Sequence, residues 1–429
     1  MKKNTAPLGG GFFTLAVIAC RNIRRNMRRT AFCVSSAAIA VFFTVFMQAW
    51  IAGMINNIEE VVRVFDTGHV NIVSAQYEAE KEYYPVQFPI GEGKNPEGIS
   101  VAELSKLVLG IEGVKAALPR IMAFATLQDS TIKHALLWGI RVQEELALNN
   151  FNLTERSNGL VEGRYPAEGN ECAVGVRMAE KAGLRVGDRL PLKTVSAQFS
   201  DKMWNPVITG IFRFDYIKYD EDVVIVDFNR LQRLLVLGDA AQQFFVYARD
   251  PSQSGAIAAA LKDKLGEENV VREWRDNYFV VIMKQSMMIF VVVYLVFMIV
   301  ASFLIVNTVV MIIHERIKEI GMMGSLGMTR GEIVRVFFFE AVFLGVLGSL
   351  LGCIAGGIAT FVFSFFPLDY NAMVGGGFKE YPMAGTLMLS FDPLILLQGF
   401  VFGVVISSIC TLIPSLKSAF VEPVEALRR

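Results

Sequence analysis

Four long apolar stretches alternate with polar segments along the chain. They cover residues 31–55, 285–313, 336–366 and 393–415. Each is longer than the roughly 20 residues that a helix needs to cross the hydrocarbon core of a bilayer. The stretch 285–313 contains no Asp, Glu, Lys or Arg. The pattern therefore predicts an α-helical membrane protein with four transmembrane helices.

A polar segment of mixed pattern, residues 56–284, separates the first apolar stretch from the second, and it is long enough to form a core of its own. Alternation of apolar and polar positions predicts strands at 69–73, 123–127, 189–195, 207–212 and 223–226. Helical periodicity predicts helices at 101–109, 176–182, 229–237 and 254–265. We therefore expect an α+β domain outside the membrane.

The first thirty residues set the orientation. They contain no acidic residue and seven basic ones, Lys2, Lys3, Arg21, Arg24, Arg25, Arg28 and Arg29. Positive charge beside a span stays on the cytoplasmic side. Residues 1–30 are thus predicted to form a basic amphipathic helix on the cytoplasmic membrane surface, in contact with membrane lipid.

With four spans, both termini then lie in the cytoplasm. Residues 56–284 and the loop 367–392 lie outside, whereas the segment 314–333 and the tail 416–429 lie inside. Two alternatives concern the N-terminus. Lipidation at Cys20 would require the following arginines to cross the membrane, and cleavage after a signal peptide normally follows a shorter apolar run than 31–55.

The third span carries Gly348, Gly352 and Gly356, four residues apart and so on one face of a helix. Small residues let helices approach closely in lipid, where no hydrophobic force drives them together. The spacing favours a helix-packing face over the alternative that glycine is simply frequent in membrane helices.

Composition and motifs argue against an enzyme. Apolar residues make up 53% of the chain, mean hydropathy is +0.44 and the net charge is zero, so no basic field favours nucleic acid. The sequence has no GxxxxGK[ST], HExxH or GxSxG motif, and the spacing of its three histidines and five cysteines suggests no metal site. We expect no catalytic residue, metal or cofactor in this chain. The acids at 220–222 are interpreted as a solvated loop.

The short cytoplasmic segment 314–333 is charged and punctuated by glycines. Glu315 and Glu319 lie one helical turn apart, whereas Gly321, Gly324 and Gly327 weaken an isolated helix by up to about 1 kcal/mol each. A segment of this kind suits docking onto a partner, although from these residues alone a plain connecting loop is an equal alternative.

The sequence ERIKEIGMMGSLGMTRGEI of this segment resembles a motif of the FtsX/MacB/Lol-type (type VII) ABC transporter permeases. Gly324 and Ser325 depart from the motif, which has a basic residue and alanine there. The stretch from Gly163 to Leu192 resembles the MacB-like periplasmic core, and TGHVNIV and EWRDN look most like the lipoprotein-releasing LolC/LolE-like permeases. The matching motif positions are Glu315, Arg316, Glu319, Ile320, Gly321, Leu326, Gly327 and Ile333.

The resemblance implies a permease subunit of the bacterial inner membrane that works as a dimer with a second copy or a paralogue. Two copies of a separate cytoplasmic ABC ATPase would bind ATP and magnesium. Segment 314–333 would be the coupling helix that relays ATP-driven movement to the outer domain, a mechanotransmission scheme for extracting lipoproteins or other amphiphilic substrates. The implied coupling residues are Glu315, Arg316, Glu319, Ile320, Gly321, Leu326, Gly327 and Arg330.

A periplasmic lipoprotein carrier is a further implied partner. Carrier-docking members bear a hairpin at the position of residues 196–206, and this interval looks short here. Docking at Phe199, Met203 or Trp204 is a hypothesis. The alternatives within the family are an FtsX-like mechanotransmitter that regulates cell-wall hydrolases and a MacB-like peptide or drug exporter. A membrane-anchored sensor is the alternative from another class.

Overall fold

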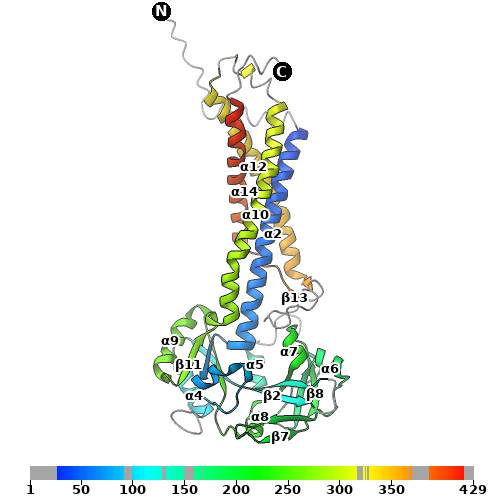
Figure 1. Ribbon diagram of the computed structural model, residues 1–429, viewed down its shortest axis with the longest axis vertical. Coiled ribbons are helices and arrows are strands. Elements are labelled where there is room, and N and C mark those ends of the chain that lie inside the picture. The colour runs from blue at the N-terminus through cyan, green and yellow to red at the C-terminus, as the bar shows by residue number, and fades with distance from the viewer. Residues whose placement is uncertain are drawn as a thin grey trace, which may run out of the picture. The chain divides into compact units, whose positions relative to one another are not determined.

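The computed structural model describes residues 27–90, 99–127, 132–148, 159–167, 169–315, 322–323, 325, 328–366, 368–369 and 386–419. The chain divides into two compact units (Figure 1). The helical unit comprises Met1–Met54, Ser286–Leu368 and Met388–Arg429. The sheet unit comprises Ile55–Gln285 and Asp369–Leu387.

Four long helices, α2 (Met27–Val61), α10 (Tyr278–Glu315), α12 (Arg330–Phe365) and α14 (Pro393–Ala419), contribute to the helical unit. Among the described residues, three helices are apolar and long enough to cross a membrane: Thr30–Thr67, Arg330–Phe365 and Pro393–Cys410. They coincide with the first, third and fourth predicted spans. The second predicted span lies within α10, where the described residues give an apolar helix at Tyr278–Val293. Most of the predicted N-terminal helix, residues 1–26, lies outside the described residues.

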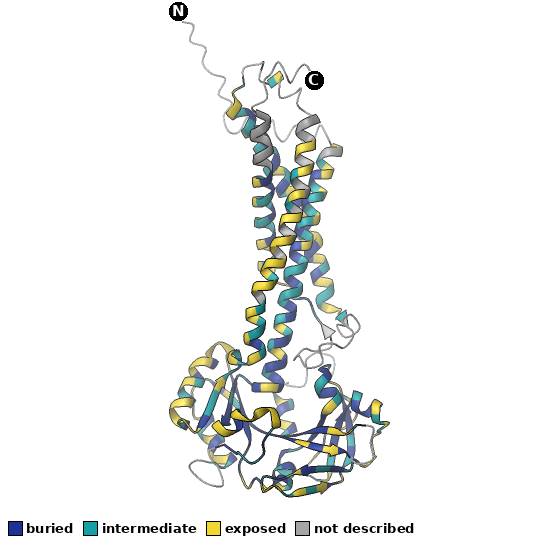
Figure 2. Ribbon diagram, viewed as in Figure 1, coloured by how far each residue is buried: buried dark blue, intermediate teal, exposed yellow. Residues whose placement is uncertain are grey.

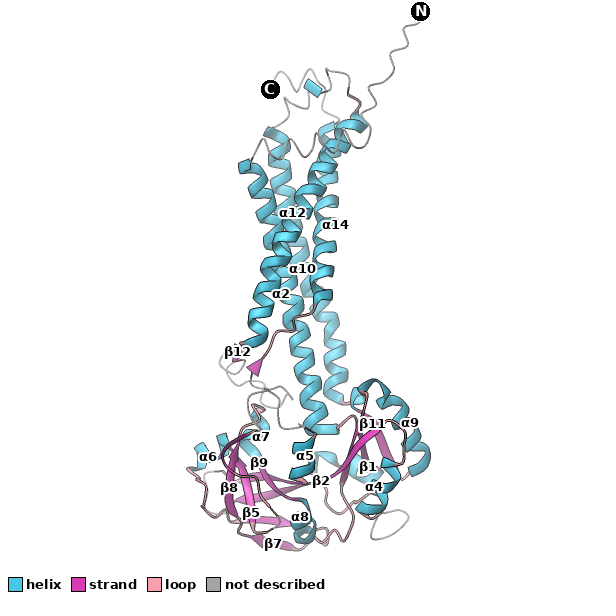
Figure 3. Ribbon diagram, turned by 180° about the vertical axis from the view of Figure 1, so that it is seen from behind, coloured by secondary structure: helices cyan, strands magenta, loops and turns pink. Residues whose placement is uncertain are grey.

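The sheet unit is built on an 11-stranded sheet, and two further short strands, β12 (Leu368–Asp369) and β13 (Thr386–Leu387), pair with each other (Figure 3). The order along the main path is β11-β1-β10-β2-β3-β9-β5-β8-β4, with β6 paired to β2 and β7 paired to β6. The strands are β1 (Val70–Ser74), β2 (Val114–Leu127), β3 (His134–Ile140), β4 (Leu160–Gly163), β5 (Glu171–Gly175), β6 (Leu192–Val195), β7 (Asp201–Trp204), β8 (Val207–Phe212), β9 (Val223–Asp227), β10 (Gln243–Ala248) and β11 (Asn269–Glu273).

Strand β2 joins the two halves of this sheet. Its first half, up to Arg120, pairs with β10, and its second half, from Ile121, pairs with β3. Because successive side chains of a strand point to opposite faces, β2 contributes to two cores at once. Ile121 and Ala123 pack in one core and Met122 packs in the other.

Short helices cover the two faces of the sheet. The larger core lies against α4 (Val101–Leu109), α6 (Val176–Ala182), α8 (Phe228–Leu235) and α9 (Ser254–Leu265). The smaller, aromatic core lies against α5 (Val142–Ala147), α7 (Ile217–Asp222) and the π-helical segment η1 (Val62–Thr67) that follows α2. The remaining short elements are α3 (Ala75–Ala79), η2 (Lys81–Tyr83), η3 (Pro251–Gln253) and η4 (Trp274–Asp276).

The predicted α+β class of this unit is confirmed, and so are several elements. The predictions at 101–109, 176–182, 207–212 and 254–265 coincide with α4, α6, β8 and α9. The interpretation of the acids at 220–222 as a solvated loop is wrong. These residues end α7, and Asp220 is buried, where its carboxylate accepts a hydrogen bond from the Phe214 N–H at 2.8 Å.

Candidate functional site

The segment between α10 and α12 is described only in part. Arg316, Glu319, Ile320, Gly321, Leu326 and Gly327 lie outside the described residues, as does the side chain of Glu315. Glu315 ends α10, and Arg330 is an exposed residue that begins α12. The role of these residues in coupling therefore stays a prediction.

Hydrogen bonds between Thr329 and Glu332 fix the start of α12. The Thr329 side chain accepts a hydrogen bond from the Glu332 N–H, and the Glu332 carboxylate accepts one from the Thr329 N–H at 2.9 Å. This capping box satisfies two backbone donors that a helix start otherwise leaves free. The sequence TRGE, with Thr three residues before Glu, is the local signal for this capping box.

A small apolar cluster lies beside the capping box. Ile333 and Phe337 of α12 are buried in it together with Cys410 of α14. Met323 and Met328, from the segment itself, pack against it, as does Val306 of α10. The two methionines thus connect the described part of the segment to three long helices.

The glycines of α12 lie against α2. A Cβ on Gly348 would lie 2.5 Å from the Ala37 Cβ, and a Cβ on Gly352 would lie 2.6 Å from the Ala38 carbonyl oxygen. At Gly356 the corresponding distance to the Val45 side chain is 3.0 Å. The backbones of α2 and α12 therefore approach along this face more closely than side chains would permit.

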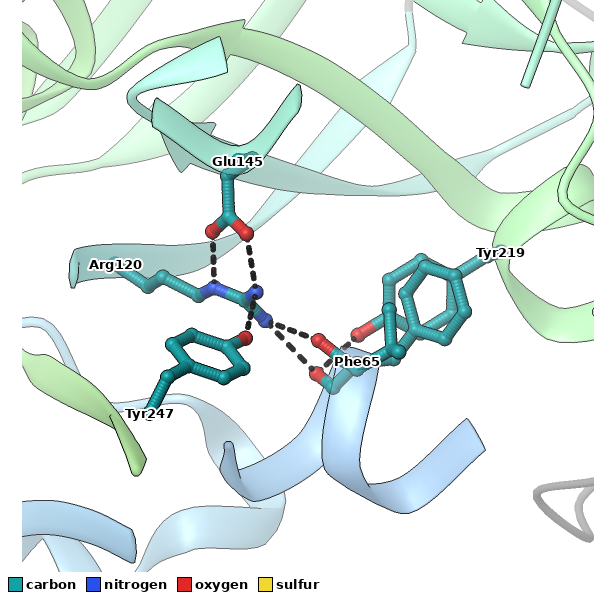
Figure 4. A network of polar contacts seen from close by, with 6 residues as sticks. Phe65, Arg120, Glu145, Tyr219 and Tyr247 are labelled. Carbon is teal, nitrogen blue, oxygen red and sulfur yellow. Dashed lines mark hydrogen bonds and ion pairs between the residues drawn. The ribbon is translucent and has the colours of Figure 1, made fainter. Parts of the chain in front are cut away.

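The sheet unit contains a buried polar network, the Arg120 network, which comprises Arg120, Glu145, Tyr247 and the carbonyl oxygens of Val64 and Phe65 (Figure 4). Arg120 and Glu145 are both 0% exposed. The guanidinium donates to the two carboxylate oxygens at 2.8 and 2.9 Å, a bidentate pair that fixes both side chains.

The remaining donors of Arg120 reach η1 and β10. They bond the Val64 carbonyl at 2.9 Å and the Tyr247 hydroxyl at 3.0 Å. Cations stabilise the carbonyl end of a helix, where backbone acceptors lack intrahelical partners. Arg120 therefore joins the π-helical continuation of α2 to both halves of the sheet, since Tyr247 lies on β10 and Glu145 lies on α5, after β3.

Aromatic rings complete the surroundings of η1. The Tyr219 hydroxyl donates to the Phe65 carbonyl at 3.0 Å, and the Phe65 ring contacts Trp138, Phe214 and Tyr219. Burial by itself would lower the pKa of Arg120, but Glu145 and Tyr247 outweigh it and hold that pKa above its ordinary value. The guanidinium is therefore charged at every physiological pH.

Burial shifts the pKa values of Asp220 and His69 in opposite directions. Burial raises the pKa of Asp220 to about 7, against the hydrogen bond from the Phe214 N–H. Burial, with Arg63 nearby, lowers the pKa of His69 to about 4, and its Nδ1 accepts a hydrogen bond from the Ala248 N–H at 2.9 Å. At neutral pH His69 is therefore uncharged.

Strands β6 and β7 form an antiparallel hairpin. Val195 pairs with Asp201, and Phe199, at φ +56°, lies in the turn. Phe199 and Met203 are 77% and 69% exposed, whereas Trp204 is only 5% exposed and its indole donates to the Asn170 side chain. Of the three residues predicted for carrier docking, Trp204 is thus an interior residue, and two offer apolar surface.

Comparison with known proteins covers almost the whole chain. Residues 30–264 match the MacB-like periplasmic core domain family, and residues 291–423 match the FtsX-like permease C-terminal family. The lipoprotein-releasing system transmembrane protein LolC of Xylella fastidiosa is 22% identical over 328 residues, which cover 73% of this chain and 78% of that protein.

Two further relatives and one solved structure are also similar to this chain. LolC of Haemophilus influenzae is 24% identical over 66% of this chain and 68% of its own. The macrolide export ATP-binding/permease protein MacB of Chlorobium phaeobacteroides is 24% identical over 49% of this chain and 31% of its own. The periplasmic region of MacB from Actinobacillus actinomycetemcomitans, a crystal structure, covers 53% of this chain and 95% of its own, with 10% identity and a TM-score of 0.32.

Proposed function

Because this chain belongs to the family of FtsX-like ABC transporter permeases with a MacB-like periplasmic core domain, we propose that it extracts lipoproteins or other amphiphilic molecules from the bacterial inner membrane. The relatives that carry the name LolC support this choice of substrate. The chain has no phosphate-binding loop of its own. ATP hydrolysis is therefore assigned to a separate cytoplasmic ATPase subunit, which binds a dimer of permeases.

The Arg120 network is the observation that carries the mechanism. Helix α2 and η1 form one unbroken helical stretch from Met27 to Thr67, and Arg120 bonds the far end of that stretch. In the proposed mechanism, four spans cross the membrane and both termini are cytoplasmic. Movement of the segment 314–333 displaces the spans, and a displacement of α2 along its axis acts on Val64 and Phe65. Arg120 then passes it to β2, which both halves of the sheet share.

The coupling step can be tested at Glu319. We expect Glu319→Lys to leave membrane insertion and ATP hydrolysis by the partner subunit in place, while release of a lipidated substrate falls at least about tenfold, since a buried or interfacial charge reversal costs well over 1.4 kcal/mol. Hydrolysis and release are measured together on the reconstituted complex in vesicles.

Lys318→Gln is the matched control, because it removes a charge from the same turn without touching the matched motif. It should release substrate like the parent chain. Normal release by Glu319→Lys would refute the coupling assignment.

The hairpin β6–β7 supports docking of a periplasmic carrier as part of this function. We expect the double substitution Phe199→Ser with Met203→Ser to reduce transfer to the carrier by about tenfold, since loss of two exposed apolar anchors typically costs 1 kcal/mol or more each. Transfer is measured as carrier-bound lipoprotein recovered from vesicles. Tyr83→Ser, at an aromatic residue 71% exposed on another element, is the control. Unchanged transfer by the double variant would exclude the hairpin as the docking surface.

A further inference from the structure

Three cationic side chains surround the indole ring of Trp274 in the sheet unit. The Arg275 and Arg63 guanidinium carbons lie 4.8 and 5.4 Å from the ring centroid, and the Lys284 Nζ lies 6.0 Å from it. They come from three elements, because Arg63 belongs to η1, Arg275 to η4 and Lys284 to α10. Cations attract the face of an indole, but like charges around one ring also repel each other.

Several hydrogen-bond donors of this group have no acceptor among the described residues. Trp274 is 5% exposed, and its Nε1–H lacks a partner. Lys284 makes no ion pair within the described part of the chain. The indole N–H is closed to solvent, whereas the side chains of Arg63 and Arg275 are 25% and 39% exposed, so a ligand can reach the charged donors.

The two arginines keep free donors as well. Arg63 uses Nε for the Glu59 carbonyl and Nη2 for the Glu60 carboxylate, and Arg275 uses only Nη1, for Glu273 and Ser254. A guanidinium has five N–H donors. Within the described residues, Nη1 of Arg63 and both Nε and Nη2 of Arg275 have no acceptor.

Carboxylates pair with part of the positive charge of this group. Glu60 and Glu273 each neutralise one arginine, Asp66 bonds Asn277, and Asp276 is exposed. The backbone carbonyl of His69 accepts a hydrogen bond from the backbone N–H of Trp274 at 3.2 Å, and the pKa of the His69 side chain responds to the nearby cations. After burial, Arg63, Lys115 and Arg275 are the groups that lower its pKa.

The position along the chain places this group at a membrane surface. Lys284 is the last charged residue before the charge-free stretch 285–313, and Tyr278, in the first turn of α10, is 67% exposed. Tyr, Trp, Lys and Arg gather at the depth of lipid headgroups, where the polar ends of these side chains meet phosphate.

We propose that Arg63, Trp274, Arg275 and Lys284 bind the phosphate of an anionic glycerophospholipid where α10 leaves the bilayer. The phosphate oxygens accept from the free guanidinium and ammonium donors, and the negative charge relieves the repulsion among the three cations. The lipid thereby holds Trp274, which is also bonded through its backbone to the residue preceding β1. This inference rests on α10 being a membrane span, as proposed above, but not on substrate or ATPase.

The test is lipid retention by the full chain, purified in detergent without any ATPase. After delipidation, equal amounts of dioleoyl-phosphatidylglycerol and dioleoyl-phosphatidylcholine are added, and bound lipid is counted by native mass spectrometry. We expect phosphatidylglycerol to be retained in preference. Arg63→Gln with Lys284→Gln should lower its retention at least about fivefold, since two charge contacts are lost. Lys262→Gln, at an exposed lysine of α9, should retain it like the parent.

Two further measurements make the result decisive. Trp274→Phe keeps an aromatic ring that attracts the three cations less strongly, and it should weaken retention less than the double variant does. Excess glycerol 3-phosphate should not displace the lipid. Equal retention of both lipids, unchanged retention by the double variant, or displacement by glycerol 3-phosphate would each overturn the proposal. Since no release or hydrolysis is measured, a failed transport model leaves this result intact.

Discussion

The two units of this protein use opposite means to hold their elements together. In the sheet unit, large side chains fill the interior: Trp138, Phe65 and Phe212 are among the largest fully buried residues, and a complete ion pair is buried with them. In the helical unit, α12 meets α2 at Gly348, Gly352 and Gly356, where α12 has no side chain. Packing in the sheet unit depends on contacts between large side chains. Packing in the helical unit depends on the absence of side chains at the glycines of α12, which lets two backbones approach closely.

Within the helical unit the same contrast separates α12 from α10. Helix α10 contains no glycine. Many of its described apolar side chains are exposed, among them Met288, Ile289 and Phe303 at 75%, 65% and 64% (Figure 2). Apolar character therefore does not decide which helices pack closely, because lipid solvates such side chains equally well. Small residues in register decide it.

Removing one member of the Arg120 network should be the most damaging change. Arg120→Met leaves the carboxylate of Glu145 buried without the guanidinium that pairs with it, and we expect a loss of stability of about 3–5 kcal/mol. Urea unfolding of the full chain in detergent, followed by near-ultraviolet circular dichroism, measures the loss. The double change Arg120→Met with Glu145→Met should restore most of it, since no unpaired charge then remains.

The control for this prediction is Lys193→Met, at an exposed pair with Asp201 on the hairpin. It should change stability by less than about 1 kcal/mol. Equal effects of Arg120→Met and Lys193→Met would mean that the sheet unit does not depend on its buried ion pair.

A side chain introduced on the glycine face should damage the helical unit by an intermediate amount. In Gly352→Val the Cβ meets the Ala38 carbonyl oxygen and Val41, and overpacking of this kind costs about 1–3 kcal/mol. Thermal unfolding in detergent measures it. Gly331→Ala, on the same helix with nothing within 4 Å, should instead be neutral or stabilise by up to about 1 kcal/mol. If both variants behave alike, the close approach of α2 and α12 contributes nothing.

In the parent chain, the smallest expected effect is a pH dependence of the stability of the sheet unit. The folded pKa of Asp220, about 7, lies above its ordinary value of 3.8, so its contribution to stability is lost as pH rises from about 4 to 7. The folded pKa of His69, about 4, lies below its ordinary 6.5, so its contribution is gained as pH rises through that window. The two largely cancel in the parent chain.

Single substitutions should uncover each slope. Between pH 4 and 6.5, stability should rise with pH in Asp220→Asn and fall with pH in His69→Gln, by at most about 1.4 kcal/mol per pH unit. Both replacements keep a hydrogen-bond acceptor. Unfolding midpoints measured across this range check the signs, and parallel profiles for the two variants would contradict the opposed titrations.

Sequence reasoning succeeded where a single period dominated. Helices α4, α6 and α9 and strand β8 have one polar and one apolar side, and their bounds followed from it. Strands β3 and β10 were missed because they are buried on both faces, so no alternation marks them. The Arg120 network was also beyond prediction. Its members Arg120, Glu145 and Tyr247 are far apart in the chain, and a sequence does not show that an arginine is buried.

The candidate sites also differ in whether local sequence spacing is enough to predict them. The glycine face could be placed from its four-residue spacing, whereas the interior position of Trp204 depends on Asn170, a partner supplied by a distant loop. The cations around Trp274 gather only because η1 and the start of α10 lie beside η4, which the topology of the folded unit determines.

Strand β1 has a consequence for how the protein folds as it is made. It pairs with β10 on one edge and β11 on the other, both encoded near the end of the sheet unit. A chain that emerges N-terminus first must therefore keep β1 with two unpaired edges until nearly the whole unit has been synthesised. Pairings of such large sequence separation form slowly and expose edges that invite aggregation. Because η4 and α10 directly follow β11, the sheet is completed as the second long helix is synthesised. Until then, the unpaired edges of β1 are a binding site for folding chaperones.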